Sequence, residues 1–112
     1  MRALVNGREN AGIDPLDRGL HYGDGLFETM AARDGRVRFL DWHFERLSAG
    51  AARLEIPLPE PSTLRAEIAA VSAPGRGIVK LIVTRGAGER GYRPPARPEP
   101  TRVVLGLPWP VL

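Results

Sequence analysis

The sequence contains no cysteine and only one lysine, Lys80, among its 112 residues. Without cysteine the chain can form no disulfide, no thiolate metal site and no cysteine nucleophile, a composition that fits a cytoplasmic protein. No run approaches the roughly 18 apolar residues that a membrane span requires, and the N-terminus lacks the pattern of a signal peptide. We therefore expect a soluble cytoplasmic protein that does not contact a membrane.

Aromatic residues are also few, at 6% of the chain. Fifteen of the 16 basic residues are arginine, and the net charge is +3 with a sequence pI near 10.2. These arginines are scattered and are not interleaved with aromatic rings that could stack on bases, so we expect no nucleic-acid partner. His21 and His43 lie far apart and have no cysteine partners, so we expect no metal site.

Apolar residues make up 43% of the chain, which is typical of one globular domain of this length. Asn6-Gly7 and Asp34-Gly35 have the composition of hairpin turns, and Asp41 and either Ser62 or Thr63 are candidate helix N-caps. The patterns predict strands at 3–5, 26–33, 36–39, 78–84 and 101–107, helices at 41–54 and 62–70, and a loop at 14–19. The fold class is therefore α+β, a mostly antiparallel sheet with two helices on one side.

Side-chain alternation in the strand at 26–33 predicts that Phe27 and Thr29 share one face while Glu28 and Met30 share the other. The strand at 78–84 is nearly continuous in apolar residues, which predicts burial on both faces at the centre of the sheet. In the first helix an apolar stripe is expected at 40, 44, 47, 51 and 54. Arg46 lies about 120° from the centre of this stripe, on a shoulder shared with His43 and Gly50.

Three places in the chain could converge on an anion. They are the glycine turn at 23–25, the helix shoulder with Arg46, and the loop carrying Arg85, Arg90 and Tyr92. Guanidinium groups bind carboxylates and phosphates in a bidentate manner, and glycines let a ligand approach the backbone. Each feature also has an ordinary interpretation as a solvated charge or a simple turn. No phosphate-binding loop or dinucleotide-binding glycine pattern is present, so the residues alone indicate an anion-binding α+β domain.

Four motifs follow one another along the chain. They are Asp17-Arg18-Gly19, Tyr22-Gly23-Asp24-Gly25 followed by Phe27-Glu28-Thr29, then His43-Phe44-Glu45-Arg46-Leu47, and Thr84-Arg85-Gly86 with Arg90-Gly91-Tyr92. In order and spacing they resemble the N-terminal part of the fold-type IV pyridoxal-phosphate enzymes, the class IV aminotransferase family, and within this family they are most similar to the 4-amino-4-deoxychorismate lyases.

The resemblance implies that the chain is the small N-terminal domain of such an enzyme, with pyridoxal 5'-phosphate as cofactor. It implies that Arg46 binds the cofactor phosphate and that Phe27, Arg90 and Tyr92 face the substrate. It also implies a homodimer, with the active site between two domains, and a reaction that converts 4-amino-4-deoxychorismate to 4-aminobenzoate and pyruvate for folate synthesis.

The Schiff-base lysine of the family is expected beyond Leu112, in a second domain, so no catalytic residue is assigned here. Lys80 matches a strand position of the small domain, and we interpret it as a lysine at the solvent side of a strand. The chain alone is therefore expected to be inactive. Two alternatives remain, a branched-chain or D-amino-acid aminotransferase and a non-catalytic anion-binding or dimerisation domain.

Overall fold

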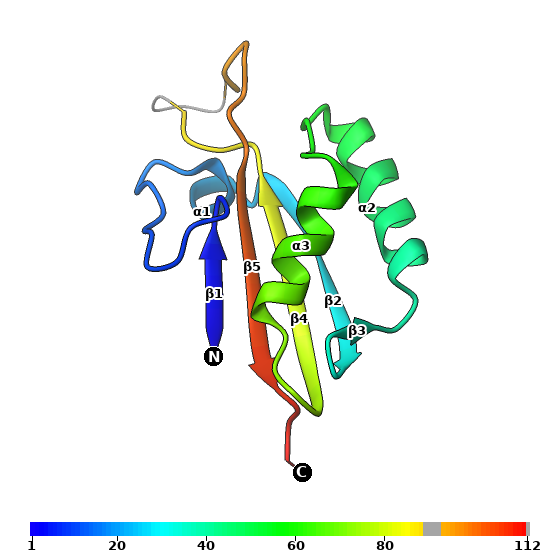
Figure 1. Cartoon of the computed structure of the whole chain (residues 1–112). Coiled ribbons are helices and arrows are strands. Elements are labelled where there is room, and N and C mark those ends of the chain that lie inside the picture. The colour runs from blue at the N-terminus through cyan, green and yellow to red at the C-terminus, as the bar shows by residue number, and fades with distance from the viewer. Residues whose placement is uncertain (89–92, 112) are drawn as a thin grey trace.

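The computed structural model describes residues 1–88 and 93–111, which form a five-stranded antiparallel sheet and three helices (Figure 1). The strand order is β1-β5-β4-β2-β3, with every neighbouring pair antiparallel. This confirms the α+β class. The strands are β1 (Arg2–Val5), β2 (Gly25–Arg33), β3 (Arg36–Val37), β4 (Arg76–Thr84) and β5 (Thr101–Pro108), and the helices are α1 (Arg18–Tyr22), α2 (Leu40–Leu54) and α3 (Pro61–Val71).

Both predicted hairpin turns are confirmed. Asn6 and Gly7 have φ angles of 51° and 79°, and Asp34 and Gly35 have φ angles of 51° and 82°. Positive φ at two successive residues matches the right-handed twist of the flanking strands, and asparagine, aspartate and glycine tolerate it best. The Asp34-Gly35 turn leads into β3, which pairs with only the last two residues of β2.

The hydrophobic core lies between one face of the sheet and helices α2 and α3 (Figure 1). Leu81 and Val83 of the central strand β4 are completely buried there, in one hydrophobic cluster with Leu47 of α2 and Ile68 of α3. The predicted alternation in β2 is confirmed, because Glu28 and Met30 are buried while Phe27 and Thr29 are exposed. A face that packs on helices explains why most of the residues on that side of these strands are apolar.

The prediction that residues 78–84 are buried on both faces is wrong. Val79, Leu81 and Val83 are buried, but Ile78, Lys80 and Ile82 on the opposite face are only half-buried. The strand does lie at the centre of the sheet, where both of its edges are paired. The face opposite α2 and α3 is met at one end by helix α1 and by Ile13 of the preceding loop. We call it the open face.

The predicted helix starts are also wrong. Asp41 does not cap α2, because the helix begins one residue earlier and its N-cap is Phe39, with φ of 57° and no side-chain hydrogen bond. In α3, Pro61 occupies the first helical turn and Glu60 is the N-cap, so neither Ser62 nor Thr63 caps this helix. Proline fits the first position because its fixed φ is helical and its missing N–H is not needed there.

The short helix α1 was not predicted and replaces part of the expected loop. Asp17 caps it, with a side-chain oxygen that accepts a hydrogen bond from the Gly19 N–H at 2.8 Å. Gly23 ends it in the left-handed conformation, at φ of 64°. A helix of five residues is too short to show helical periodicity in the sequence. Only its two caps, Asp17 and Gly23, could have indicated it. No helix of the described residues is long and apolar enough to cross a membrane.

Candidate functional site

The glycine turn before β2 is held by one carboxylate whose side chain is 15% exposed. Asp24 Oδ2 accepts hydrogen bonds from Nε of Arg18 and from Nε of Arg85, both at 2.8 Å. The Arg85 guanidinium continues to the C-terminal end of α2, where Nη2 donates to the Leu54 carbonyl at 2.7 Å. Asp24 therefore links α1, the turn, the end of β4 and the last turn of α2. We call these three charged residues the Asp24 hub.

The hub is ionised and shielded from solvent. Burial alone would raise the pKa of the Asp24 carboxyl, but hydrogen bonds and charge from Arg85 and Arg18 outweigh it and hold the pKa below its ordinary value. The sequence suggested Arg85 as an anion ligand. Its guanidinium is instead occupied by Asp24 and the carbonyls of Leu54 and Glu55, and its side chain is only 13% exposed.

The two glycines of the turn are required for different physical reasons. Gly23 sits at positive φ with open space around its α-carbon, so it serves the left-handed helix end. A Cβ on Gly25 would lie 2.4 Å from the Val83 carbonyl oxygen of β4. Gly25 is therefore required by the close approach of the neighbouring strand rather than by a ligand.

The same turn region supports the start of the loop that follows β4. The Arg18 N–H donates to the Gly86 carbonyl at 2.8 Å, and Asp17 forms an isolated bridge with Ala87. Arg90 and Tyr92, which the resemblance assigns to the substrate, lie outside the described residues. Their roles therefore stay predictions.

Phe27 lies on the open face, as its place in the alternation predicted. Its side chain is 60% exposed and lines a mainly apolar hollow of roughly 460 Å³ with Leu20, Ile82 and Val103. Lys80 lies next to it, with Nζ 4.7 Å from the centre of the phenyl ring. An exposed aromatic ring beside an apolar hollow can bind the flat part of a small organic molecule.

Arg46 lies on the opposite side of β2, where it joins two residues that the sequence analysis did not assign to a site role. The Glu28 carboxylate is buried and accepts hydrogen bonds from Arg46 Nε at 2.9 Å and Nη2 at 2.7 Å. It also lies 2.6 Å from Nδ1 of His43. Since a carboxylate can only accept, the Nδ1 proton of His43 points at Glu28. The predicted helix shoulder of His43 and Arg46 thus faces β2.

Arg46 is held on one side and open on the other. Its side chain is 54% exposed, and its guanidinium lies over the ring of Trp42 at 4.5 Å. Among the described residues, Nη1 has no hydrogen-bond partner. A guanidinium with one edge bound to a carboxylate and the other directed to solvent can receive an anion at the outer edge.

The structure therefore brings Arg46 together with Glu28 and His43, but it does not bring Arg46 and Phe27 into one hollow. They stand on the two sides of the same strand, because Phe27 and Glu28 are successive residues of β2. Glu28 could have been recognised from the sequence, since alternation placed an acidic residue on the buried face beside Met30, and a buried carboxylate requires a partner.

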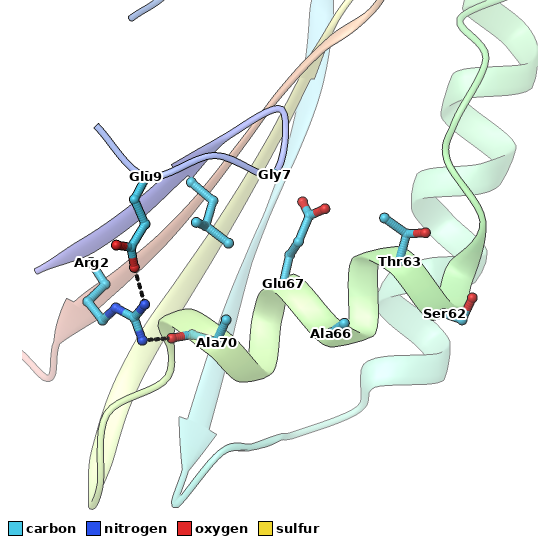
Figure 2. Close-up of a pocket in the computed structure, with 9 residues that line it drawn as sticks. Arg2, Gly7, Glu9, Ser62, Thr63, Ala66, Glu67 and Ala70 are labelled. Carbon is cyan, nitrogen blue, oxygen red and sulfur yellow. Dashed lines mark hydrogen bonds and ion pairs between the residues drawn. The ribbon is translucent and has the colours of Figure 1, made fainter. Parts of the chain in front are cut away.

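A second hollow lies on the helix side, between the turn after β1 and helix α3 (Figure 2). Arg2 forms an ion pair with Glu9 and donates to the Ala70 carbonyl at its rim. None of the predicted site residues lines it. Within residues 1–88 and 93–111, no group of three or more histidine, aspartate or glutamate side chains is placed to hold a metal ion.

Comparison with known proteins places the chain in a family. Residues 25–111 match the model of the amino-transferase class IV family. A solved 4-amino-4-deoxychorismate lyase from Pseudomonas aeruginosa is 50% identical and superposes with a TM-score of 0.86 over 96% of this chain and 40% of its own. A pyridoxal-phosphate-bound hypothetical aminotransferase from Mycobacterium tuberculosis is 26% identical, with a TM-score of 0.79 over 98% of this chain and 40% of its own.

A D-alanine aminotransferase from Listeria monocytogenes is 35% identical over 94 residues, which cover 77% of this chain and 32% of that enzyme. The chain thus spans about 40% of the two solved structures and about a third of the Listeria enzyme. The matched region includes β2 with Phe27 and Glu28 and helix α2 with Arg46. From the family match and these similarities, we conclude that the chain belongs to the amino-transferase class IV family.

Proposed function

We propose that this chain is the small domain of a pyridoxal-phosphate-dependent lyase that converts 4-amino-4-deoxychorismate to 4-aminobenzoate and pyruvate. The observation that carries the proposal is the 50% identity, over 96% of the chain, to the lyase from Pseudomonas aeruginosa. The exposed edge of Arg46 and the apolar hollow beside Phe27 agree with it, because the reaction requires an anion site and a site for a flat organic ring.

The residues around Arg46 fit the phosphate group of the cofactor. Arg46 would hold this phosphate through the outer edge of its guanidinium, which protrudes from α2 into solvent. When bound, pyridoxal phosphate supplies an electron sink for the substrate carbon next to nitrogen. The contribution of this chain is to bind and orient, and the lysine that attaches the cofactor belongs to a second domain, beyond Leu112.

Substrate recognition is assigned to the open face and to the loop after β4. Phe27 would pack against the substrate ring and exclude water from one side of it, while Arg90 and Tyr92 would bind a substrate carboxylate. Lys80 has no catalytic role in this proposal. Its ammonium lies over the ring of Phe27, where it can help to orient that ring.

The proposal includes a cytoplasmic homodimer with active sites between domains. The exposed apolar residues that line the hollow of the open face support the homodimer, since a soluble monomer rarely leaves such a group uncovered. They include Ile13, Leu20 and Phe27, with exposed fractions of 50%, 73% and 60%.

An aminotransferase is the second candidate, favoured by the similarity to the D-alanine aminotransferase. The two are separated by one assay on the full-length enzyme loaded with pyridoxal phosphate. Release of pyruvate and 4-aminobenzoate from 4-amino-4-deoxychorismate, faster than transfer of an amino group from D-alanine or a branched-chain amino acid to 2-oxoglutarate, supports the lyase. The opposite order supports the aminotransferase, and neither reaction in a folded, loaded enzyme would refute both.

A further inference from the structure

Glu28 is placed as a fixed support for Arg46. It belongs to β2, a strand paired along its whole length with β4, and its side chain is 5% exposed. Both carboxylate oxygens are used, since Oε2 accepts from Arg46 Nε while Oε1 accepts from Arg46 Nη2 and contacts His43 Nδ1. Such a bidentate pair fixes the plane of a guanidinium as well as its position.

The support is negatively charged. Burial would raise the pKa of the Glu28 carboxyl, but hydrogen bonds from Arg46 and His43 and the Arg46 charge hold it below its ordinary value. The pKa of Arg46 is correspondingly raised, chiefly by its hydrogen bond to Glu28. Glu28 is therefore ionised at neutral pH and remains an acceptor for both donors.

His43 holds Glu28 from the other side. It is buried in α2, one turn before Arg46, and its ring contacts Trp42 edge to face at 5.5 Å. Trp42 in turn lies against the Arg46 guanidinium. The side chain of Arg46 is thus confined by a carboxylate along one edge and an indole ring against its face, and the remaining edge is directed to solvent.

We propose that Glu28 and His43 are positioning residues that hold Arg46 in the one orientation in which its outer edge receives a phosphate monoester. Neither residue needs to touch the phosphate. This inference rests on the proposed function, because the phosphate in question is that of the cofactor. It predicts that loss of Glu28 weakens binding of the phosphate group and leaves binding of the cofactor ring unchanged.

The test compares equilibrium binding of pyridoxal phosphate and of pyridoxal, which lacks the phosphate, to the full-length apoenzyme. In Glu28→Gln the charge is lost and Arg46 is free to adopt other rotamers. If the competent rotamer is then populated about one tenth of the time, the Kd for pyridoxal phosphate rises about tenfold. The Kd for pyridoxal should stay within about twofold, since no phosphate contact is involved.

A matched control exists elsewhere in the fold. Glu67 of α3 is also buried and accepts from Arg102 Nε at 2.8 Å and Nη2 at 2.8 Å. Arg102 belongs to β5, and this pair contains no residue assigned to cofactor or substrate. Glu67→Gln should lower thermal stability much as Glu28→Gln does, yet leave the ratio of the two Kd values unchanged.

Arg46→Ala separates failure of the proposed function from failure of this inference. If Arg46→Ala does not change the ratio of the Kd values, the phosphate role of Arg46 is wrong and the proposed function loses its cofactor site. If Arg46→Ala changes the ratio but Glu28→Gln does not, or if Glu28→Gln weakens binding of both ligands equally, the positioning role is wrong.

A second variant covers the case in which Glu28→Gln does not fold. His43→Asn removes one contact to Glu28 and keeps the negative charge of Glu28. A smaller rise confined to pyridoxal phosphate would then support the inference, and an unchanged ratio would overturn it.

Discussion

The Asp24 hub provides the sharpest test of how the motif region is built. Asp24→Asn keeps the size of the side chain and removes its charge, which takes the carboxylate partner away from Arg85, whose side chain is only 13% exposed. Removal of one partner from a buried ion pair costs about 3 to 5 kcal/mol. Given the unfolding entropy of a chain of this length, that loss in the free energy of unfolding corresponds to a fall in Tm of roughly 12 to 20 °C.

Thermal unfolding followed by circular dichroism measures the effect, and Asp41→Asn is the control. Asp41 also forms an ion pair, with Arg65, but its side chain is 92% exposed. Solvent screens such a pair, so its loss should lower Tm by less than about 4 °C. The two variants therefore compare the same chemical change in buried and exposed positions.

The pH dependence adds a second readout. The pKa of Asp24 is depressed in the folded state, so its stabilising effect is fully present above the unfolded value, near 3.8, and is lost as the pH falls through the folded value. The difference in stability between wild type and Asp24→Asn should thus be constant from neutral pH to about pH 4 and shrink below it. A fall in Tm no larger than that of Asp41→Asn, or a difference that does not change with pH, would refute the hub.

Three further predictions concern the turn and the open face. Gly25→Ala should lower stability by about 2 kcal/mol or more, because its Cβ would meet a neighbouring carbonyl, whereas Gly23→Ala should cost only about 1 kcal/mol for its positive φ, as urea unfolding can show. Phe27→Ala should leave Tm within about 3 °C, since the ring is exposed, while raising the KM for 4-amino-4-deoxychorismate in steady-state assays of the full-length enzyme. Lys80→Gln should leave covalent attachment of the cofactor intact, which mass spectrometry after borohydride reduction can measure.

Local signals in the sequence predicted most of the sheet. Asn6-Gly7 and Asp34-Gly35 determine their turns through backbone conformations that few other residues adopt, so neighbouring strands could be placed from them. Alternation then assigned Phe27 and Met30 to opposite faces. These features depend on residues close together in the chain, which explains why no tertiary information was needed.

Errors arose where tertiary contacts decide the outcome. The apolar run of β4 predicted two buried faces, but its open-face residues are only half-buried in this chain, and no sequence pattern says whether a second layer belongs to the same chain. The start of a helix depends on one or two residues. Phe39 and Glu60 are the N-caps of α2 and α3, and neither side chain forms a capping hydrogen bond. The helix α1 was too short to be recognised.

The candidate site was predicted in part. Arg46 was located on its helix shoulder, but its pairing with Glu28 joins residues 18 positions apart and could not be read from spacing. Arg85 illustrates the opposite case. Its motif suggested that it binds a ligand, but in the structure its guanidinium forms an ion pair with Asp24. A charged residue in a glycine-rich loop can serve either purpose, and only its partners distinguish them.

The most direct test of the central claim is to load the full-length protein with pyridoxal phosphate, reduce it with borohydride, and map the modified residue by peptide mass spectrometry. Our account predicts one cofactor adduct on a lysine beyond Leu112, and no adduct in a chain limited to residues 1–112. An adduct on Lys80, or a folded full-length protein that takes up no cofactor, would contradict it.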